Sequence, residues 1–170
     1  GDWAPYRIIP DCVQAWSKNE KPEIRSPFAT RPWQHVLEPL SGYISLAIAL
    51  SKNNKLNGEA FNFGPPAHQN HTVKELVDEI VTHWKGAGWL DKSKENSTPP
   101  EAGLLKLNCD KALHLLGWQA TLNFKETAKW TGEWYRIFYE NGPEIAYKQS
   151  LNQINDYLAI ATERNTFKLG

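Results

Sequence analysis

The stretch from residue 38 to residue 54, EPLSGYISLAIALSKNN, limits the possible folds more than any other part of the sequence. Pro39 suits the first turn of a helix, and the middle of the stretch is almost entirely apolar. A helix of this kind needs burial on more than one side. Residues 59–66, EAFNFGPP, follow as a short buried strand that Gly64 and two prolines end. This pair is typical of the last helix and strand of a larger parallel sheet, whose other strands we do not find in the chain.

The other periodic segments are mostly helical. Thr72 with Glu75, and Asn123 with Glu126, have the spacing of capping boxes, which predicts helices over 72–86 and 123–142. Further helices are expected from Pro10 to 19, over 109–117 and over 144–163, and short extended pieces at Ile24, at 33–36 and over 104–108. The sequence therefore predicts an α/β fold that is mostly helical, with a few short strands.

Length and charge narrow the class of protein. A chain of 170 residues is expected to form a single domain over 1–170. Nineteen basic residues balance nineteen acidic ones, so we expect no nucleic-acid partner. The sequence has no apolar run of the length that a membrane span needs and no signal-peptide pattern, so we expect no membrane insertion.

Two further features concern the origin of the chain. Its two cysteines, Cys12 and Cys109, form neither a disulfide framework nor a metal-binding pattern, and we expect buried free thiols in a cytoplasmic protein. The chain contains no methionine and opens on Gly-Asp-Trp, so we expect it to be part of a longer protein.

The sequence contains no recognisable catalytic centre. It has no G-x-G-x-x-G, Walker loop, Y-x-x-x-K, G-x-S-x-G or H-E-x-x-H pattern, so a dinucleotide or ATP site within this chain is not expected. His68 and His71 form an H-x-x-H, but well-spaced further ligands are absent nearby, and we expect no metal site. Three of the five arginines lie in the first 31 residues beside prolines and tryptophans, where they could either bind phosphate or form ordinary surface ion pairs.

Four stretches occur in order: GDWAPYRIIPD at the start, RPWQHVLEPLSGYISLA from Arg31, EAFNFGP from Glu59 and PPEAGLLKLNCDKALHLLGW from Pro99. In wording and spacing they resemble the C-terminal portion of the CDP-glucose 4,6-dehydratases, a family of extended short-chain dehydrogenases/reductases. The resemblance covers nearly the whole chain. RPWQHVLEPLSGY is specific to this branch, because dTDP-glucose dehydratases and epimerases have related but different residues there.

The resemblance implies a two-part enzyme of deoxysugar and lipopolysaccharide O-antigen biosynthesis. An N-terminal Rossmann half would bind NAD and supply the catalytic residues, and the C-terminal half would bind the nucleotide sugar, CDP-glucose. NAD would take hydride from sugar C4, water would leave from C5 and C6, and the hydride would return to C6. Residues 1–170 would be the substrate-binding part, with helix 38–54 and strand 59–64 belonging to the Rossmann sheet. The parent would be a homodimer, and this chain alone is expected to have no turnover and weak NAD binding.

The resemblance also assigns substrate-binding residues. They are Arg7 and Ile8, then Pro22, Glu23 and Ile24, then Arg31, then Thr72, and finally Thr98, Pro99, Pro100 and Glu101. Backbone groups of 22–24 would meet the base, Arg31 would reach ribose and diphosphate, and helix amides next to Thr72 would favour an anion. Residues 98–102 would close over the diphosphate, although Pro100 replaces the family's histidine, and Asn108 replaces an aspartate.

Two alternatives stay open on the sequence. The chain could be the substrate domain of another nucleotide-sugar dehydratase or epimerase, against which RPWQHVLEPL argues. It could also be a non-catalytic carbohydrate-binding or scaffold module that uses some of its eight tryptophans. The burial of Trp33, Trp89 and Trp118 separates these classes, because sugar-binding tryptophans should be exposed.

Overall fold

The computed structural model describes residues 1–95 and 105–166 of the chain. The helices are α1 (Ile8–Ser17), α2 (Leu37–Lys52), α3 (Val73–Val81), α4 (Asp110–Leu116), α5 (Phe124–Asn141) and α6 (Pro143–Arg164), with 3-10 turns η1 (Asn54–Leu56) and η2 (Ser93–Glu95). The strands are β1 (Glu23–Ile24), β2 (Thr30–Arg31), β3 (His71–Thr72) and β4 (Leu90–Asp91). The expectation of a mostly helical fold with short strands is confirmed.

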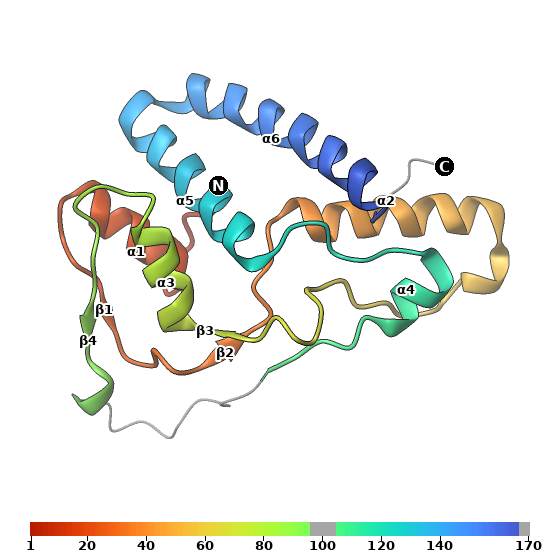
Figure 1. Cartoon of the computed structure of the whole chain (residues 1–170), viewed down its shortest axis with the longest axis horizontal. Coiled ribbons are helices and arrows are strands. Elements are labelled where there is room, and N and C mark those ends of the chain that lie inside the picture. Colours follow the sequence, from red (N-terminus) through yellow and green to blue (C-terminus); the bar gives the residue numbers. More distant parts are fainter. Residues whose placement is uncertain (96–104, 167–170) are drawn as a thin grey trace.

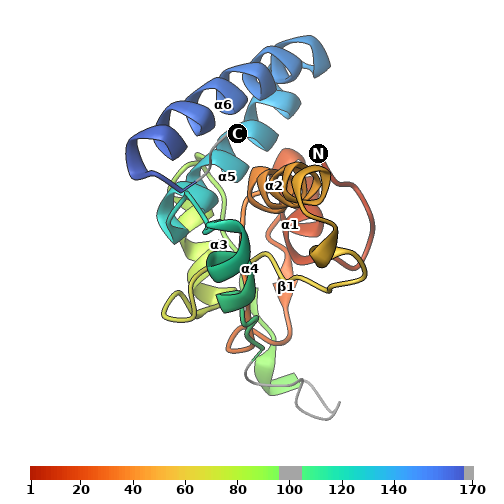
Figure 2. The same ribbon diagram turned by 90° about the vertical axis from the view of Figure 1, so that its right-hand side faces the viewer.

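The helices form two groups (Figure 1). α5 and α6 run antiparallel and pack along each other, and α1 and α3 pack against α5. α2 extends to the other side of the molecule, where α4 packs beneath it (Figures 1 and 2). The strands form two separate pairs: β1 is parallel to β4, and β2 is antiparallel to β3.

The larger hydrophobic cluster, called here the main core, lies between α1, α3 and α5. Its buried members are Cys12, Val13, Trp16, Ile24, Ala29, Val73, Leu76, Val77, Ile80, Trp84, Ala128 and Tyr135. All four buried residues of α3 belong to this cluster, because they recur at intervals that place them on one helix face. The capping box predicted at its start is present, with Thr72 Oγ1 accepting from Glu75 N at 3.1 Å and Glu75 Oε2 accepting from Thr72 N at 2.7 Å.

A buried carboxylate connects α2 to α6. Glu38, in the first turn of α2, is only 1% exposed. Its two oxygens accept hydrogen bonds from Thr121 N at 2.9 Å, Leu122 N at 2.7 Å and the Tyr157 hydroxyl at 2.9 Å. Burial raises the pKa of Glu38, although the two backbone donors act in the opposite direction. This carboxylate fixes the start of α2 to the segment before α5 and to the second half of α6.

A second carboxylate connects the start of α5 to the end of α6. Glu126 completes the second predicted capping box, because its Oε2 accepts from Asn123 N at 2.8 Å. The Arg164 guanidinium binds the same carboxylate with two hydrogen bonds: Nη2 donates to Oε1 at 2.6 Å, and Nη1 donates to Oε2 at 2.8 Å. Arg164 Nη1 also donates to Thr121 O at 2.7 Å. The sequence predicted the cap but gave no sign of the distant arginine.

Two predicted strands are wrong for this structure. Residues 59–64 and 105–108 have irregular backbones, because among the described residues no strand lies beside them to complete a ladder. Residues 59–64 still pack inward: Phe63 is buried, and its ring lies edge-on to Trp118 at 4.9 Å. Phe63 O accepts from Gln34 Nε2 at 3.1 Å, which joins this segment to the residues before α2.

Smaller corrections concern boundaries and thiols. α1 begins at Ile8 and not at Pro10, and α3 ends at Val81, five residues before the predicted end. Cys12 is fully buried as expected, but Cys109 is half-buried, because it lies beside a surface hollow that Gly64 and its neighbours border.

The apolar middle of α2 is largely uncovered. The buried residues of this helix are Glu38, Ser41 and Gly42, all near its start. Farther along, Tyr43 is 59% exposed and Ile44 is 47% exposed. The expectation that this helix requires burial on more than one side is therefore not met by the described residues. Among all the residues that the structure describes, we find no helix with both the length and the hydropathy of a membrane span.

Candidate functional site

The predicted substrate-binding segments that the structure describes all border the main core. Ile24 is one of its buried members, Ile8 packs against it, and Val73 follows Thr72 directly. Trp33, two residues after Arg31 in the sequence, packs against the same cluster. Thr98, Pro99, Pro100 and Glu101 lie outside the described residues. Four separate segments thus border the same hydrophobic cluster, while their detailed contacts differ.

At β1, the pairing with β4 uses one edge of the strand. Leu90 N donates to Pro22 O at 2.9 Å, and Lys92 N donates to Ile24 O at 2.9 Å. Because peptide groups alternate in direction along a strand, the N–H and C=O of Glu23 face away from β4. Residues 22–24 therefore present a backbone donor and acceptor side by side at the outer edge.

At β2, Arg31 lies opposite His71 and Thr30 lies opposite Thr72. The antiparallel pairing thus brings two predicted site residues, Arg31 and Thr72, onto neighbouring strands. Arg31 Nη1 donates to Thr30 O at 2.7 Å, and the Trp33 indole donates to His71 O at 2.9 Å. Trp33 therefore ties the segment after β2 to β3.

The expectation that the first amides of α3 favour an anion is wrong in this structure, because these amides are already bonded. Val73 N donates to Ala29 O at 2.9 Å, and Lys74 N donates to Pro27 O at 2.8 Å. The capping box uses the amides of Thr72 and Glu75. The Glu75 carboxylate, whose pKa is lowered chiefly by its bond from the Thr72 backbone, also places negative charge here. A ligand contact by Thr72 itself stays a prediction.

Arg7 is exposed and precedes the first residue of α1. Its Nη1 lies 3.1 Å from Asp2 Oδ2, in an ion pair that is open to solvent. An ion pair of this kind contributes little to stability, so the Arg7 guanidinium can leave Asp2 and bind another anion with little loss of free energy.

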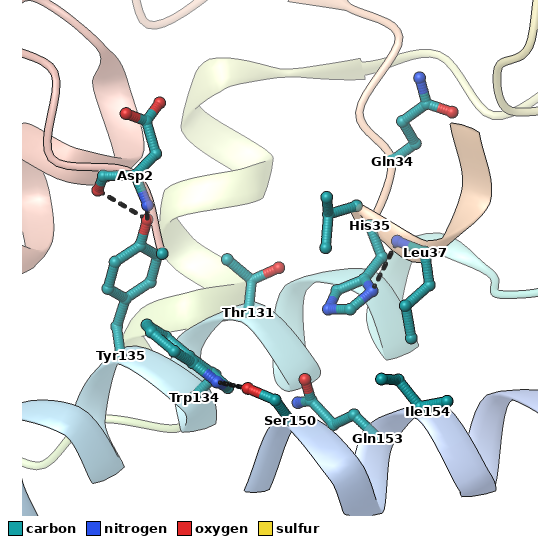
Figure 3. A pocket seen from close by; sticks show the side chains of 12 residues that line it. Asp2, Gln34, His35, Leu37, Thr131, Trp134, Tyr135, Ser150, Gln153 and Ile154 are labelled. Carbon is teal, nitrogen blue, oxygen red and sulfur yellow. Dashed lines mark hydrogen bonds between the residues drawn. The ribbon is translucent and has the colours of Figure 1, made fainter. Parts of the chain in front are cut away.

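A cavity of about 400 Å³ lies between the residues before α2 and the paired helices α5 and α6 (Figure 3). Its walls are largely apolar and include Val36, Trp134 and Ile154. His35 points into this space, and its Nδ1 accepts from Leu37 N at 3.4 Å (Figure 3). Burial lowers the pKa of His35 to about 4, so the ring is neutral at pH 7 and carries its proton on Nε2.

No predicted substrate-binding residue in the described part of the chain lines this cavity. Its lining comes from three parts of the chain, namely its first residues, the residues around the start of α2, and α5 with α6. The last two parts are more than 90 residues apart in sequence. Nothing in the sequence indicated that Thr131 and Gln153 would line a cavity together with His35.

The tryptophans favour a packing role over sugar binding. Trp118 is fully buried, and Trp33 and Trp89 are half-buried. Their indole N–H groups donate to protein acceptors: Trp118 to Ser41 Oγ at 2.8 Å and Trp89 to Asp78 Oδ1 at 2.8 Å. Indoles that are at least half-buried and hydrogen-bonded within the protein in this way stabilise a core. The alternative of a tryptophan-based carbohydrate-binding module loses its main support.

Among the described residues, His68 and His71 are not joined by further side chains in a cluster that could hold a metal ion. His71 stacks on Phe124 with ring centroids 3.7 Å apart, and its Nδ1 lies 3.6 Å from Glu75 Oε1. Within residues 1–95 and 105–166, no three His, Cys, Asp or Glu side chains are gathered in a way that could hold a metal ion.

Comparison with known proteins bears on these sites. Over 163 residues, or 95% of the chain, the sequence is 40% identical to the CDP-glucose 4,6-dehydratase of Salmonella typhimurium strain LT2, of which the match covers 44%, in its C-terminal part. No model of a known protein family matches the chain. The resemblance that the sequence motifs indicated is confirmed, and the chain spans less than half the length of this relative.

A solved structure supports the fold. The crystal structure of a UDP-glucose-4-epimerase from Stenotrophomonas maltophila, with bound NAD and formylated UDP-arabinopyranose, matches with a TM-score of 0.61 and 18% identity. The match covers 81% of this chain and 42% of the epimerase chain. At this identity the likeness concerns the fold alone, and it agrees with the mostly helical α/β fold that the sequence predicts.

Proposed function

We propose that the chain is the nucleotide-sugar-binding part of a CDP-glucose 4,6-dehydratase. The observation that supports this most strongly is the 40% identity to such an enzyme along 95% of the chain. We further propose that the complete enzyme is a cytoplasmic, NAD-dependent lyase that acts as a homodimer. Residues outside 1–170 would supply its catalytic groups and would bind its NAD. The part described here would bind and orient the substrate.

The edge of β1 is the proposed base-binding position. The outward N–H and C=O of Glu23 can pair with the adjacent acceptor and donor on the edge of a pyrimidine, as a neighbouring strand would. Cytosine and uracil both offer such a pair, so this edge alone favours pyrimidines in general. Discrimination between them would come from side chains around the base.

Arg31 is the proposed contact to the diphosphate. Its guanidinium carries five donors in a planar fork whose spacing matches the oxygens of a phosphate, and one of its nitrogens donates to Thr30 O at 2.7 Å. Arg31 is only half-buried, so removing water from its guanidinium when an anion binds costs little free energy. Arg7, released from Asp2, is the second proposed cation at the same ligand.

The test is calorimetry with CDP-glucose, CDP, UDP and dTDP. We expect CDP-glucose and CDP to bind more tightly than the other nucleotides. Arg31→Ala should weaken binding roughly tenfold to hundredfold, as expected for charge-assisted hydrogen bonds of about 1.5–3 kcal/mol. Arg136→Ala is the matched control, since Arg136 pairs with Glu140 on α5 at 2.7 Å. Equal losses in the two variants, or no nucleotide binding to the wild-type chain, would contradict the proposal.

We also propose that the exposed apolar face of α2 receives the NAD-binding half of the same enzyme. The face consists of Val36, Leu40, Tyr43 and Ile44, which are exposed and follow one another at helical spacing. Contiguous apolar surface of this kind is typical of a contact region.

This docking can be measured with a separately produced N-terminal half of the Salmonella enzyme. The wild-type chain should bind it and restore CDP-glucose turnover, which the chain alone should lack. Ile44→Lys should abolish both effects, because it places a charge in the contact. Leu113→Lys on α4 is the control, since Leu113 is 50% exposed and Ile44 is 47% exposed. Turnover by the chain alone would overturn this division of labour.

A further inference from the structure

We propose that Asn57 is a site of spontaneous deamidation, in which the backbone nitrogen of Gly58 attacks the Asn57 side chain. The sequence contains Asn-Gly twice, at 57–58 and at 141–142. In both pairs the asparagine is exposed, and both glycines have a positive φ, +80° at Gly58 and +83° at Gly142. The two pairs differ in the partner of the glycine N–H.

The first pair follows η1, in the connection between α2 and the next segment. Asn57 N donates to Asn54 O at 3.1 Å, and Glu59 N donates to Leu56 O at 3.1 Å. Between these two bonds, the N–H of Gly58 has no hydrogen-bond acceptor among the residues that the structure describes. An added Cβ at Gly58 would meet nothing within 4 Å, so the surroundings are open. The Gly58 nitrogen is therefore available to react.

The second pair lies at the junction of α5 and α6. Asn141 is the last residue of α5, and Gly142 N donates to Phe138 O at 2.9 Å. Gly142 O in turn accepts from Ala146 N at 3.2 Å, in the first turn of α6. The nitrogen of Gly142 can reach the Asn141 side chain only after these helix-end bonds open. The chain thus contains its own control for the reaction.

The reaction requires only water. The Gly58 nitrogen forms a bond to Cγ of Asn57 and loses its proton, the Cγ–Nδ2 bond breaks, and ammonia leaves, which gives a five-membered imide. Water then adds to either imide carbonyl and opens the ring, producing aspartate or isoaspartate at position 57. No electrons are transferred. Base accelerates the first step because it removes the proton from the attacking nitrogen.

The experiment is incubation of the purified chain at neutral and at mildly alkaline pH, followed by peptide mapping with mass spectrometry. We expect deamidation at Asn57 to be about tenfold faster than at Asn141, a ratio that corresponds to about 1.4 kcal/mol for opening the protected site. The rate at Asn57 should rise with pH. Because each event converts a neutral amide into a negatively charged carboxylate, it should also produce a more acidic species on isoelectric focusing.

Incubation in concentrated urea provides the control, since unfolding removes the bond at Gly142 and the two sites should then react at similar rates. In the folded protein, Asn57→Gln should slow the appearance of the acidic species about tenfold, while Asn141→Gln should leave its rate nearly unchanged. Equal rates at Asn57 and Asn141 in the folded chain would overturn the proposal. So would a folded chain in which Asn57 stays intact while it deamidates in urea.

Discussion

At the scale of single residues, Glu38 shows how a charged side chain can be used inside the protein. Thr121, Leu122 and Tyr157 donate to its two oxygens, so the cost of desolvating the carboxylate is offset by hydrogen bonds. Tyr157 also shares a hydrogen bond with Ser41 Oγ at 2.9 Å. Losing the carboxylate would leave several buried donors without an acceptor.

We expect Glu38→Ala to lower the free energy of unfolding by about 3 kcal/mol or more, because each buried donor left unpaired costs about 1–3 kcal/mol. Glu38→Gln should cost much less. Its amide oxygen can still accept from Thr121 and Leu122, and its amide nitrogen can donate to Tyr157, whose hydroxyl then turns to Ser41. Urea denaturation of the two variants measures the difference. Similar losses for alanine and glutamine would contradict this account of the network.

Glu38 also predicts a pH dependence. Burial raises its pKa in the folded protein above the ordinary value of 4.5, so the folded state holds the proton more tightly than the unfolded chain. Its contribution to stability is therefore complete below pH 4.5 and is lost as the pH rises through the folded-state pKa. Glutamine does not titrate. The stability of the wild type relative to Glu38→Gln should fall as the pH increases above 4.5, and a difference that rises with pH would refute the direction of this shift.

At the scale of elements, α2 and residues 59–64 are joined through a close approach. An added Cβ at Gly42 would overlap the Phe63 ring, at 2.5 Å from its Cγ. The ring cannot move aside easily, because Trp118 and Tyr43 lie edge-on to it at 4.9 Å and 5.7 Å. Glycine is therefore required here by the space between the two elements.

Gly42→Ala should destabilise the chain by about 1 kcal/mol or more, since overpacking costs about 1–3 kcal/mol and the better helix propensity of alanine returns only part of it. Thermal unfolding measures the loss. Combining Gly42→Ala with Phe63→Leu gives a double-mutant cycle in which the two changes should couple favourably, because the smaller side chain removes the overlap. Strict additivity would show that the ring is not the obstacle.

Elements governed by local chemistry were predictable from the sequence. The starts of α3 and α5 follow from capping boxes, whose partners are three residues apart. The strand predicted over 59–64 failed because a strand needs a neighbour, and sequence patterns do not say whether one is present. The two-residue pairs β1–β4 and β2–β3 join segments about 40 to 70 residues apart, and their length is too small to leave a periodic signal.

At the scale of the whole molecule, burial is unevenly distributed. α3 places Val73, Leu76, Val77 and Ile80 in the main core, whereas the buried residues of the longer α2 lie near its start. The free energy of local opening should therefore be higher in α3 than in the middle of α2, since few buried contacts hold the latter closed.

Hydrogen exchange followed by mass spectrometry should show faster exchange around Tyr43 to Leu50 than in α3. Adding the N-terminal half of a CDP-glucose 4,6-dehydratase should slow exchange in this part of α2 and leave the already protected α3 nearly unchanged. A chain in which α2 is as protected as α3 when alone would argue against an uncovered face.

The candidate site was predictable only in part, again for reasons of distance. The motifs indicated Arg31 and Thr72 separately, and the structure adds that they lie on paired strands. The cavity around His35 was not foreseen, because its walls come from segments that only the complete fold brings together. The first amides of α3 seemed suited to an anion by sequence, but Ala29 and Pro27 carbonyls from a distant segment already use two of them.

Glu126 has a consequence for how the sequence can change during evolution. One carboxylate both caps α5 and binds Arg164 at the end of α6. Glutamine could keep the cap but not the charge, and aspartate is too short to reach both partners. A surface position that would ordinarily tolerate many residues is therefore restricted almost to one, and we expect homologous chains to vary at 126 only when 164 varies with it.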